Sequence, residues 1–347
     1  MTYVPDYMTP QPQPPGRGGL MAFGIISILI GAMAGCMSLA MPLTLAASKV
    51  APAGAPALTI GSVVTALMFY IVIAVGFIWT GIGSCQCRRW VRPLILCIAW
   101  PWLVMGSLAG IMVVPMMRDM PLPATPGAPA QARTIVLVVG GVVMAIVYIA
   151  IPLAYICFYQ RRSVRTTLNL CDPRPRWTER CPMPVLGLGI WLLIFGLGSI
   201  SMLQYRCVPL FGTYVTGLPA AGLILGLAAA IVFAAWACYH QRPAGWWIAL
   251  LAILGWAVSA LLTFHFVGIM EFYRHSGLPR DQMALLEQQP VLHGHLPMLM
   301  AAVFGTVCTA YLLYVRRYFA SPRPADRNAI LDNPHRSLSP TNSAHNP

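Results

Sequence analysis

The sequence predicts an all-α polytopic membrane protein, a helix bundle of eight transmembrane helices arranged as two parallel four-helix repeats. The first observation is composition: 58% of the 347 residues are hydrophobic and only 9% are charged, whereas roughly a quarter of the residues in a soluble domain are charged. The second is that the apolar residues gather in eight runs of about 20 residues or more, enough to cross a hydrocarbon core ~30 Å thick. A mean hydropathy of +0.70 excludes disordered and coiled-coil proteins, which need polar or charged repeats.

Each apolar run is expected to be a helix, because backbone groups in lipid must pair within their own segment. The runs of the first repeat are 20–46, 57–82, 91–117 and 134–159. The runs of the second repeat are 183–205, 215–239, 244–270 and 291–315. The first run is predicted to be an anchor, because it is too long for a signal-peptide core and no small-residue cleavage site follows closely.

Polar segments separate and flank the two repeats. Residues 1–19 form a Pro-rich N-terminus and residues 321–347 a tail rich in Pro, Ser, Asn and Arg, and both are predicted to be disordered. Residues 166–183 form an Arg-rich connector. The first repeat therefore covers residues 20–165, and the second covers residues 184–320.

The distribution of basic residues predicts the orientation. With both termini inside, 16 Lys and Arg residues lie on the inner side and six on the outer side. The positive-inside rule therefore places both termini in the cytoplasm. The expected location is the plasma membrane of a bacterium, a source indicated by the excess of Arg over Lys and by the short loops.

Similar residues at the helix ends of the two halves predict an internal duplication. The matched residues are Trp90 and Trp100 with Trp246 and Trp256, and Tyr159-Gln-Arg161-Arg162 with Tyr314-Val-Arg316-Arg317. Each repeat has an even number of helices, so both repeats start from the same side of the membrane. The repeats are therefore parallel, and inverted-repeat transporter folds are disfavoured.

The residues missing from the helices limit the function. No predicted helix has a central Asp, Glu, Lys or Arg, which argues against ion pumps and proton-coupled carriers. The chain has no nucleotide-binding or hydrolase motif and no loop long enough for a soluble catalytic domain. We therefore expect a non-enzymatic protein with a structural or interaction role. The first alternative is a carrier or channel for a small neutral or apolar solute, and the second is a metal- or haem-binding redox or sensor protein.

Two groups of residues are candidate metal ligands. On the outer side, His265, His293 and His295 lie near Glu271 and could bind a metal or a haem iron. The other interpretation is a structural histidine beside a solvated loop, with a short amphipathic helical turn over 281–287.

On the inner side, Cys85-Gln-Cys87 ends the second helix and Cys238-Tyr-His240 ends the sixth helix, at the matching place in the second repeat. Such residues are acceptable zinc ligands, although the spacing is not a strong zinc pattern. The alternative is free thiols in a reducing cytoplasm. No particular cofactor is predicted.

The expected partner is the lipid bilayer. Nucleic acid is not expected, because the positive charges flank apolar segments and serve orientation. Small residues recur four apart, a spacing that lets helix backbones approach closely within the bundle or in a homo-oligomer. The pairs are Gly31 with Gly35, Gly106 with Gly110, and Gly222 with Gly226.

Overall fold

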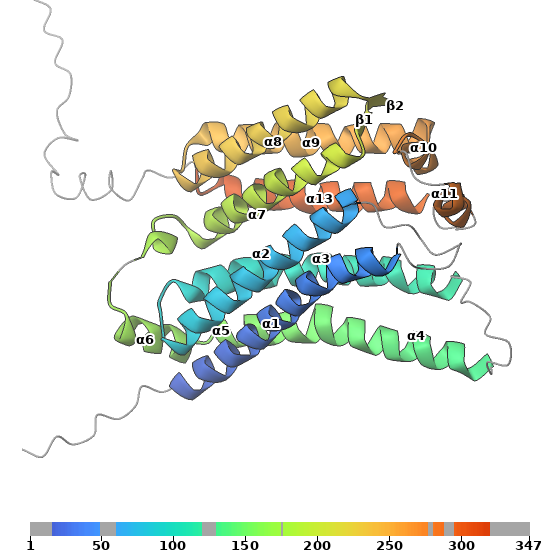
Figure 1. Cartoon of the computed structure of the whole chain (residues 1–347). Helices are drawn as coiled ribbons and strands as arrows, with labels where there is room; N and C mark the ends of the chain where they lie inside the picture. The colour runs from blue at the N-terminus through green and yellow to red at the C-terminus, as the bar shows by residue number, and fades with distance from the viewer. Residues whose placement is uncertain are drawn as a thin grey trace, which may run out of the picture.

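The computed structural model describes residues 16–48, 60–119, 130–174, 176–276, 280–287 and 295–319. Eight of its helical segments are long and apolar enough to cross a membrane, which confirms the predicted number. They run side by side as one elongated bundle (Figure 1). The protein is therefore an all-α membrane bundle in its main architecture.

The first half of the chain supplies four of these segments. The fourth is continuous but changes geometry, because a π-helical turn, η1, joins α4 to α5, which carries Pro152 near its start. A π turn is a common way to absorb an irregularity inside a long helix. The bounds are α1 (Arg17–Ser48), α2 (Ile60–Cys85), α3 (Val91–Asp119), α4 (Ala130–Ala145), η1 (Ile146–Ala150) and α5 (Ile151–Tyr159).

The second half supplies the other four. The first of them is extended by a 3₁₀ turn, η3, and the other three are uninterrupted helices. Their bounds are α7 (Met183–Ser199), η3 (Ile200–Gln204), α8 (Leu218–Tyr239), α9 (Pro243–Phe266) and α13 (Leu296–Arg316).

Short elements between the helices were not predicted in full. An antiparallel hairpin pairs β1 (Cys207–Leu210) with β2 (Thr213–Thr216), and α10 (Ile269–His275) follows α9. The predicted runs 215–239 and 244–270 extend into these elements and are wrong at those ends. The physical reason is backbone geometry: Gly217 (φ 75°) and Gly268 (φ 79°) adopt left-handed conformations that stop a helix. The helix predicted over 281–287 is confirmed as α11 (Arg280–Glu287).

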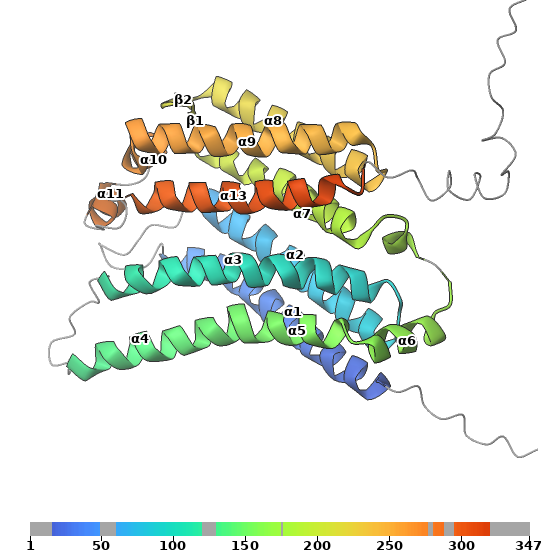
Figure 2. The same cartoon turned by 180° about the vertical axis from the view of Figure 1, so that it is seen from behind.

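The predicted connector and the four residues before it fold against one end of the bundle, and residues 162–183 are called the connector from here on. This segment contains α6 (Arg162–Cys171) and the 3₁₀ turn η2 (Trp177–Glu179), and α6 buries Val164, Thr167 and Leu168. We call this end, which also holds the α2–α3 turn, the connector face. The opposite end, with the hairpin, α10 and α11, is the cap face. α1 begins and α13 ends at the connector face (Figures 1 and 2), as an even number of spans requires.

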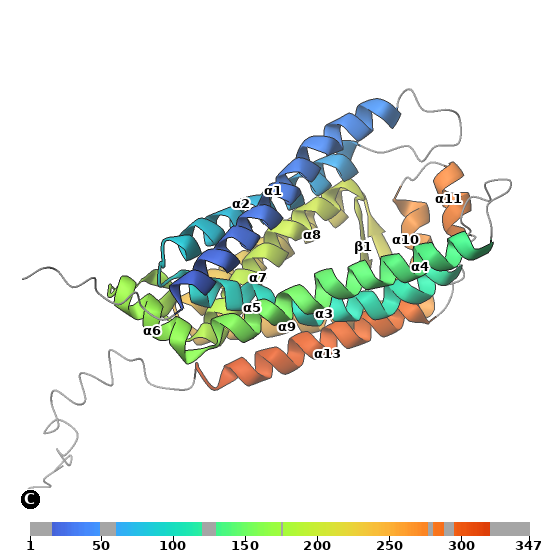
Figure 3. The ribbon, with the colours of Figure 1, turned by 90° about the horizontal axis from the view of Figure 1, so that it is seen from below.

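Two buried clusters form the core, one in the first half and one mainly in the second half, which also includes Cys97 of α3. Tyr159 and Leu168 belong to the first cluster, and Ile231 and Trp246 belong to the second. Met183 packs against both. A cross-connection joins α3 to α7, where Trp191 Nε1 donates a hydrogen bond of 2.8 Å to the Cys97 carbonyl. α1 instead packs chiefly against α2, and the two helices lie together along one side of the bundle (Figure 3).

Candidate functional site

The outer histidines do not form a cluster that the structure describes. His265 is exposed at the end of α9, where its ring lies 5.0 Å from the Phe266 ring. His295 is exposed just before α13, and His293 lies outside the described residues. Among the residues that the structure describes, no group of three or more His, Cys, Asp or Glu could hold a metal ion. The outer metal site stays a prediction, because one of its members is not described.

The inner Cys and His residues lie in two different places. Cys87 belongs to the core cluster of the first half and Cys238 to that of the second. Cys85 is half-buried, and its thiol lies 3.8 Å from the Met21 carbonyl. His240 is exposed, with Nδ1 2.9 Å from the Trp236 carbonyl oxygen. Cys87 and Cys238 therefore belong to different core clusters, and the inner metal site stays a prediction.

The turns after α2 and α8 have the same backbone geometry, but the Cys85/Cys87 and Cys238/His240 pairs occupy different positions in them. Cys87 and Gln241 both have φ 53°. In each turn this residue donates its backbone N–H to the carbonyl three residues earlier, Ser84 or Cys238. Cys87 therefore corresponds to Gln241, and Cys238 corresponds to Ser84, so the cysteines do not occupy matching places. Burial and the neighbouring Cys171 thiol raise the pKa of Cys87, which keeps its thiol protonated at neutral pH.

Polar groups at the cap face hold local structure together. Ser259 Oγ donates to the Pro209 carbonyl (2.9 Å) and accepts from the Phe211 N–H (3.0 Å), while Thr263 Oγ1 accepts from the Gly212 N–H (3.1 Å). No sequence pattern marks these hydroxyls. They anchor the β1–β2 hairpin to α9.

The charged residues at the cap face lie close together in the α10–α11 region. Glu271 carboxylate oxygens lie 3.2 Å from Arg274 Nη1 and 3.4 Å from His275 Nδ1, and Arg274 also reaches Glu287 (3.7 Å). These contacts agree with the interpretation of this segment as a solvated charged loop.

Inside the spans, polar side chains of the first half are paired with one another. The hydroxyls of Ser27 and Tyr155 are 2.8 Å apart, and those of Ser84 and Tyr159 are 2.6 Å apart. Ser84 Oγ also donates to the Leu20 carbonyl at 2.9 Å. The cavity beside this network, between α2, α3 and α5, measures only about 10 Å³, close to the space that one water needs.

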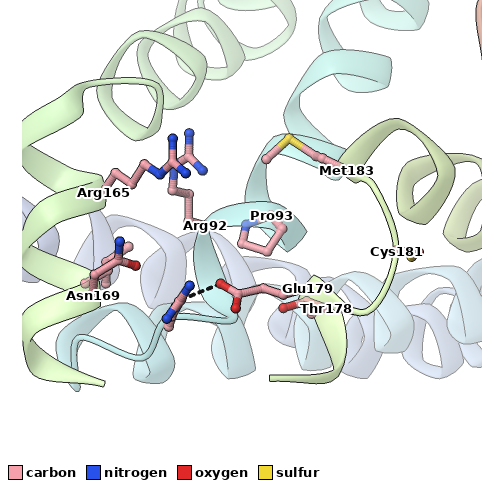
Figure 4. A pocket seen from close by; sticks show the side chains of 10 residues that line it. Arg92, Pro93, Arg165, Asn169, Thr178, Glu179, Cys181 and Met183 are labelled. Atoms are coloured by element: carbon pink, nitrogen blue, oxygen red, sulfur yellow. Dashed lines mark hydrogen bonds and ion pairs between the residues drawn. The ribbon is translucent and has the colours of Figure 1, made fainter. Parts of the chain in front are cut away.

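A much larger cavity, of about 390 Å³, opens at the connector face. We call it the arginine pocket (Figure 4). Its walls come from the α2–α3 turn, the start of α3, α6, η2 and the segment leading into α7. The lining residues are Arg89, Arg92, Pro93, Arg165, Leu168, Asn169, Thr178, Glu179, Cys181 and Met183.

The charges of the arginine pocket are unequal. Three guanidinium groups line it, and Glu179 is the one carboxylate among the lining residues. Arg89 Nε pairs with the Glu179 carboxylate, and Arg92 Nε donates to the Tyr159 carbonyl at 2.9 Å. Burial raises the pKa of the Cys181 thiol to about 11, so this cysteine stays neutral. The arginine pocket is therefore electropositive, and its cysteine is not ionised.

In the sequence, the pocket arginines are recognisable only as orientation signals. Arg165 and Asn169 are four residues apart on α6 and therefore share one helix face, but nothing local indicates that this face meets Arg92. The pocket depends on the packing of the connector against α3, which a single sequence does not reveal.

Comparison with protein-family models, with curated proteins and with solved structures finds no match to this chain. The class of protein therefore follows from the fold itself. Eight apolar helices in one bundle define a multi-pass helical membrane protein.

Proposed function

We propose that this chain is a non-enzymatic integral membrane protein with a structural or interaction role. It sits in a bacterial plasma membrane with both termini in the cytoplasm, so the connector face is the cytoplasmic face. The observation that carries the proposal concerns the partners of the polar groups in the spans: the Ser27 and Ser84 hydroxyls bond Tyr155, Tyr159 and backbone carbonyls, and none of these described partners is a His, Asp, Glu or Lys side chain. A nucleophile needs a neighbouring base to activate it.

One hydroxyl inside the spans departs from this pattern. Thr309 Oγ1 in α13 is buried and has no hydrogen-bond partner in the described part of the chain. No described group of His, Cys, Asp and Glu large enough for a metal site accompanies it. A single threonine hydroxyl is a weak nucleophile by itself, so Thr309 does not change the proposal.

The size of the cavity between α2, α3 and α5 favours an interaction role over a carrier role. A carrier encloses its solute within the membrane, but about 10 Å³ of space cannot hold a solute larger than water. Flux of a panel of small neutral solutes into proteoliposomes is expected to equal that of protein-free vesicles. Saturable uptake of any member would overturn this choice in favour of the carrier.

Glycines on the lipid-facing surface support interaction between copies. Gly31 packs inside the molecule, where an added Cβ would lie 2.9 Å from the Ala74 carbonyl oxygen. Gly222 and Gly226 on α8 instead face outward, and an added Cβ would meet nothing within 4 Å. Small residues four apart on an open helix face suit close helix association in lipid. We therefore assign the homo-oligomer face to α8.

Two matched contacts support the arrangement as two parallel repeats. The α2–α3 and α8–α9 turns share the backbone geometry described above. In each half, the third span also donates a side-chain hydrogen bond to a carbonyl near the end of the fourth. The donors are Arg92, to Tyr159 (2.9 Å), and Trp246, to Leu312 (2.8 Å).

Counting subunits in single nanodiscs by fluorophore photobleaching tests the interaction role. Wild-type protein is expected to show two or more bleaching steps per particle, and Gly226→Leu is expected to show one. Gly198→Leu is the matched control, because Gly198 is also exposed on a helix with nothing within 4 Å of an added Cβ. Single steps in wild-type protein, or equal loss in both variants, would reject the α8 face.

A further inference from the structure

We infer that the arginine pocket is a binding site for a phosphoryl group, carried either by an anionic lipid headgroup or by a soluble phosphorylated compound, and held between Arg92 and Arg165. This inference concerns a ligand at the connector face; its lipid source rests on the proposed cytoplasmic orientation of that face, and it does not depend on oligomerisation through α8.

The arginine pocket carries positive charge that no carboxylate of the pocket compensates. The Glu179 carboxylate is already paired with Arg89. Arg165, on α6, forms no side-chain hydrogen bond or ion pair with the part of the chain that the structure describes. Its guanidinium lies near that of Arg92, and the two charges repel each other. An anion between two guanidinium groups converts this repulsion into attraction to both.

The same pocket also has a buried hydroxyl without a hydrogen-bond partner among the described residues. Thr178 in η2 is only 2% exposed, and its Oγ1 has no hydrogen-bond partner in the described structure. Burying a hydroxyl without a partner is unfavourable, so such groups in native proteins usually bind a water or a ligand. Thr178 lines the pocket beside Glu179 (Figure 4), where a ligand oxygen would satisfy it.

The directions of the hydrogen-bond donors indicate the chemistry of the ligand. Donors approach the pocket from three elements: Arg92 from α3, Arg165 and Asn169 from α6, and Thr178 from η2. A carboxylate offers two oxygens in one plane, whereas a phosphoryl group presents terminal oxygens in three directions. Guanidinium groups bind such oxygens through paired, charge-assisted hydrogen bonds. The donor arrangement therefore suits a phosphoryl group better than a carboxylate.

The position of the pocket at the ends of two spans bears on the source of the ligand. Arg92 is the second residue of α3 and Met183 is the first residue of α7, so the pocket lies where two spans leave the bilayer. Pro93, Leu168 and Met183 give it an apolar wall. Basic pockets between helix ends at a cytoplasmic surface suit phospholipid headgroups. The pocket volume of about 390 Å³ also lies within the range of small-molecule sites. Both a lipid headgroup and a soluble phosphorylated compound would therefore fit, and an experiment must distinguish them.

The experiment uses full-length protein in phosphatidylcholine nanodiscs. The soluble arm titrates inorganic phosphate and glycerol 3-phosphate and follows binding by thermal shift. The lipid arm adds dioleoyl phosphatidic acid and counts retained lipids by native mass spectrometry. The variants are Arg165→Gln and Thr178→Val, with Arg174→Gln as the control. Arg174 is exposed in the same connector but does not line the pocket.

Loss of one charge-assisted contact in Arg165→Gln is expected to weaken binding at least tenfold, in the range typical of hydrogen bonds to charged groups. Thr178→Val is expected to weaken binding and also to raise the melting temperature of the ligand-free protein, because it removes an unsatisfied hydroxyl. Arg174→Gln is expected to bind like wild type. Binding in the soluble arm identifies a soluble ligand, and selective retention of phosphatidic acid identifies a lipid. Absence of binding in both arms, or an equal loss in Arg174→Gln, overturns the inference.

Discussion

Gly24 on α1 and Gly81 on α2 bring the backbones of the two helices into direct contact. A Cβ added at Gly81 would lie 2.7 Å from the Gly24 carbonyl oxygen, and one added at Gly24 would lie 2.9 Å from the Gly81 carbonyl oxygen. Because backbone atoms cannot move aside as a flexible side chain can, only glycine fits at both positions. The close α1–α2 pair is therefore a direct consequence of these two residues.

Substitution at this contact is expected to destabilise the protein. Gly81→Ala forces α1 away from α2 and should cost about 1–3 kcal/mol, the range typical of overpacking. Gly76→Ala is the control, because Gly76 lies on the same helix with nothing within 4 Å of an added Cβ. The control is expected to be neutral or stabilising, since alanine favours helix over glycine. Thermal unfolding in detergent provides the comparison, and equal melting temperatures for the two variants would refute the predicted contact.

The hydroxyl network between α2 and α5 is expected to contribute to stability. Tyr159→Phe removes one of the two partners of Ser84 Oγ, while the bond to the Leu20 carbonyl stays. The substitution should lower the free energy of unfolding by about 1 kcal/mol, the usual value for one hydrogen bond. Tyr148→Phe is a suitable control, because Tyr148 packs against Gly106 and no side-chain hydrogen bond is described for it. If Tyr148→Phe destabilised as much as Tyr159→Phe, the effect would not come from the Ser84 bond.

The β1–β2 hairpin is expected to depend on two hydroxyls of α9. Replacing Ser259 with Ala and Thr263 with Val removes the acceptors for the Phe211 and Gly212 N–H groups. Amide hydrogen exchange of residues 207–216 should therefore become faster while the spans stay protected. Thr306→Val serves as the control, since the Thr306 hydroxyl bonds only the Ala302 carbonyl of its own helix. Unchanged exchange in the double variant would show that the hairpin is held by other contacts.

Acid is expected to loosen the connector. The hydrogen bonds from Arg176 lower the pKa of Asp172. A carboxyl group whose pKa is lower in the folded protein stabilises it above its unfolded pKa of about 4, and this stabilisation disappears as the pH falls through the folded pKa. Limited proteolysis of the connector should accelerate in wild-type protein as the pH falls below about 4. Asp172→Asn should be cleaved faster at neutral pH and lose that part of the pH dependence; a wild-type dependence in the variant would exclude Asp172 as its source.

The spans could be predicted from the sequence, because the thickness of the bilayer fixes how long an apolar helix must be. The ends of the sixth and seventh runs could not, since Gly217 and Gly268 adopt backbone conformations that hydropathy does not encode. Backbone conformation also decides how the candidate cysteine ligands of the two halves align. Cys238 resembles a partner of Cys85 by spacing, yet the turn geometry aligns it with Ser84.

The arginine pocket was beyond sequence reasoning for a different reason. Arg92 and Arg165 are far apart in the chain and meet only because α6 folds back against the start of α3. In the sequence both count as positive charges beside an apolar run, which is the signature of topology. Thr178 carries no signal at all, because an unsatisfied hydroxyl is a property of packing.

A cryo-EM map of the protein in nanodiscs that contain phosphatidic acid tests most directly whether the functional site lies at the connector face. A compact density is expected between Arg92 and Arg165, within hydrogen-bond distance of Thr178 Oγ1. Inorganic phosphate added to phosphatidylcholine nanodiscs should produce the same density if the ligand is soluble. A pocket that is empty in both maps, at a resolution where acyl chains along the spans are visible, would contradict the account.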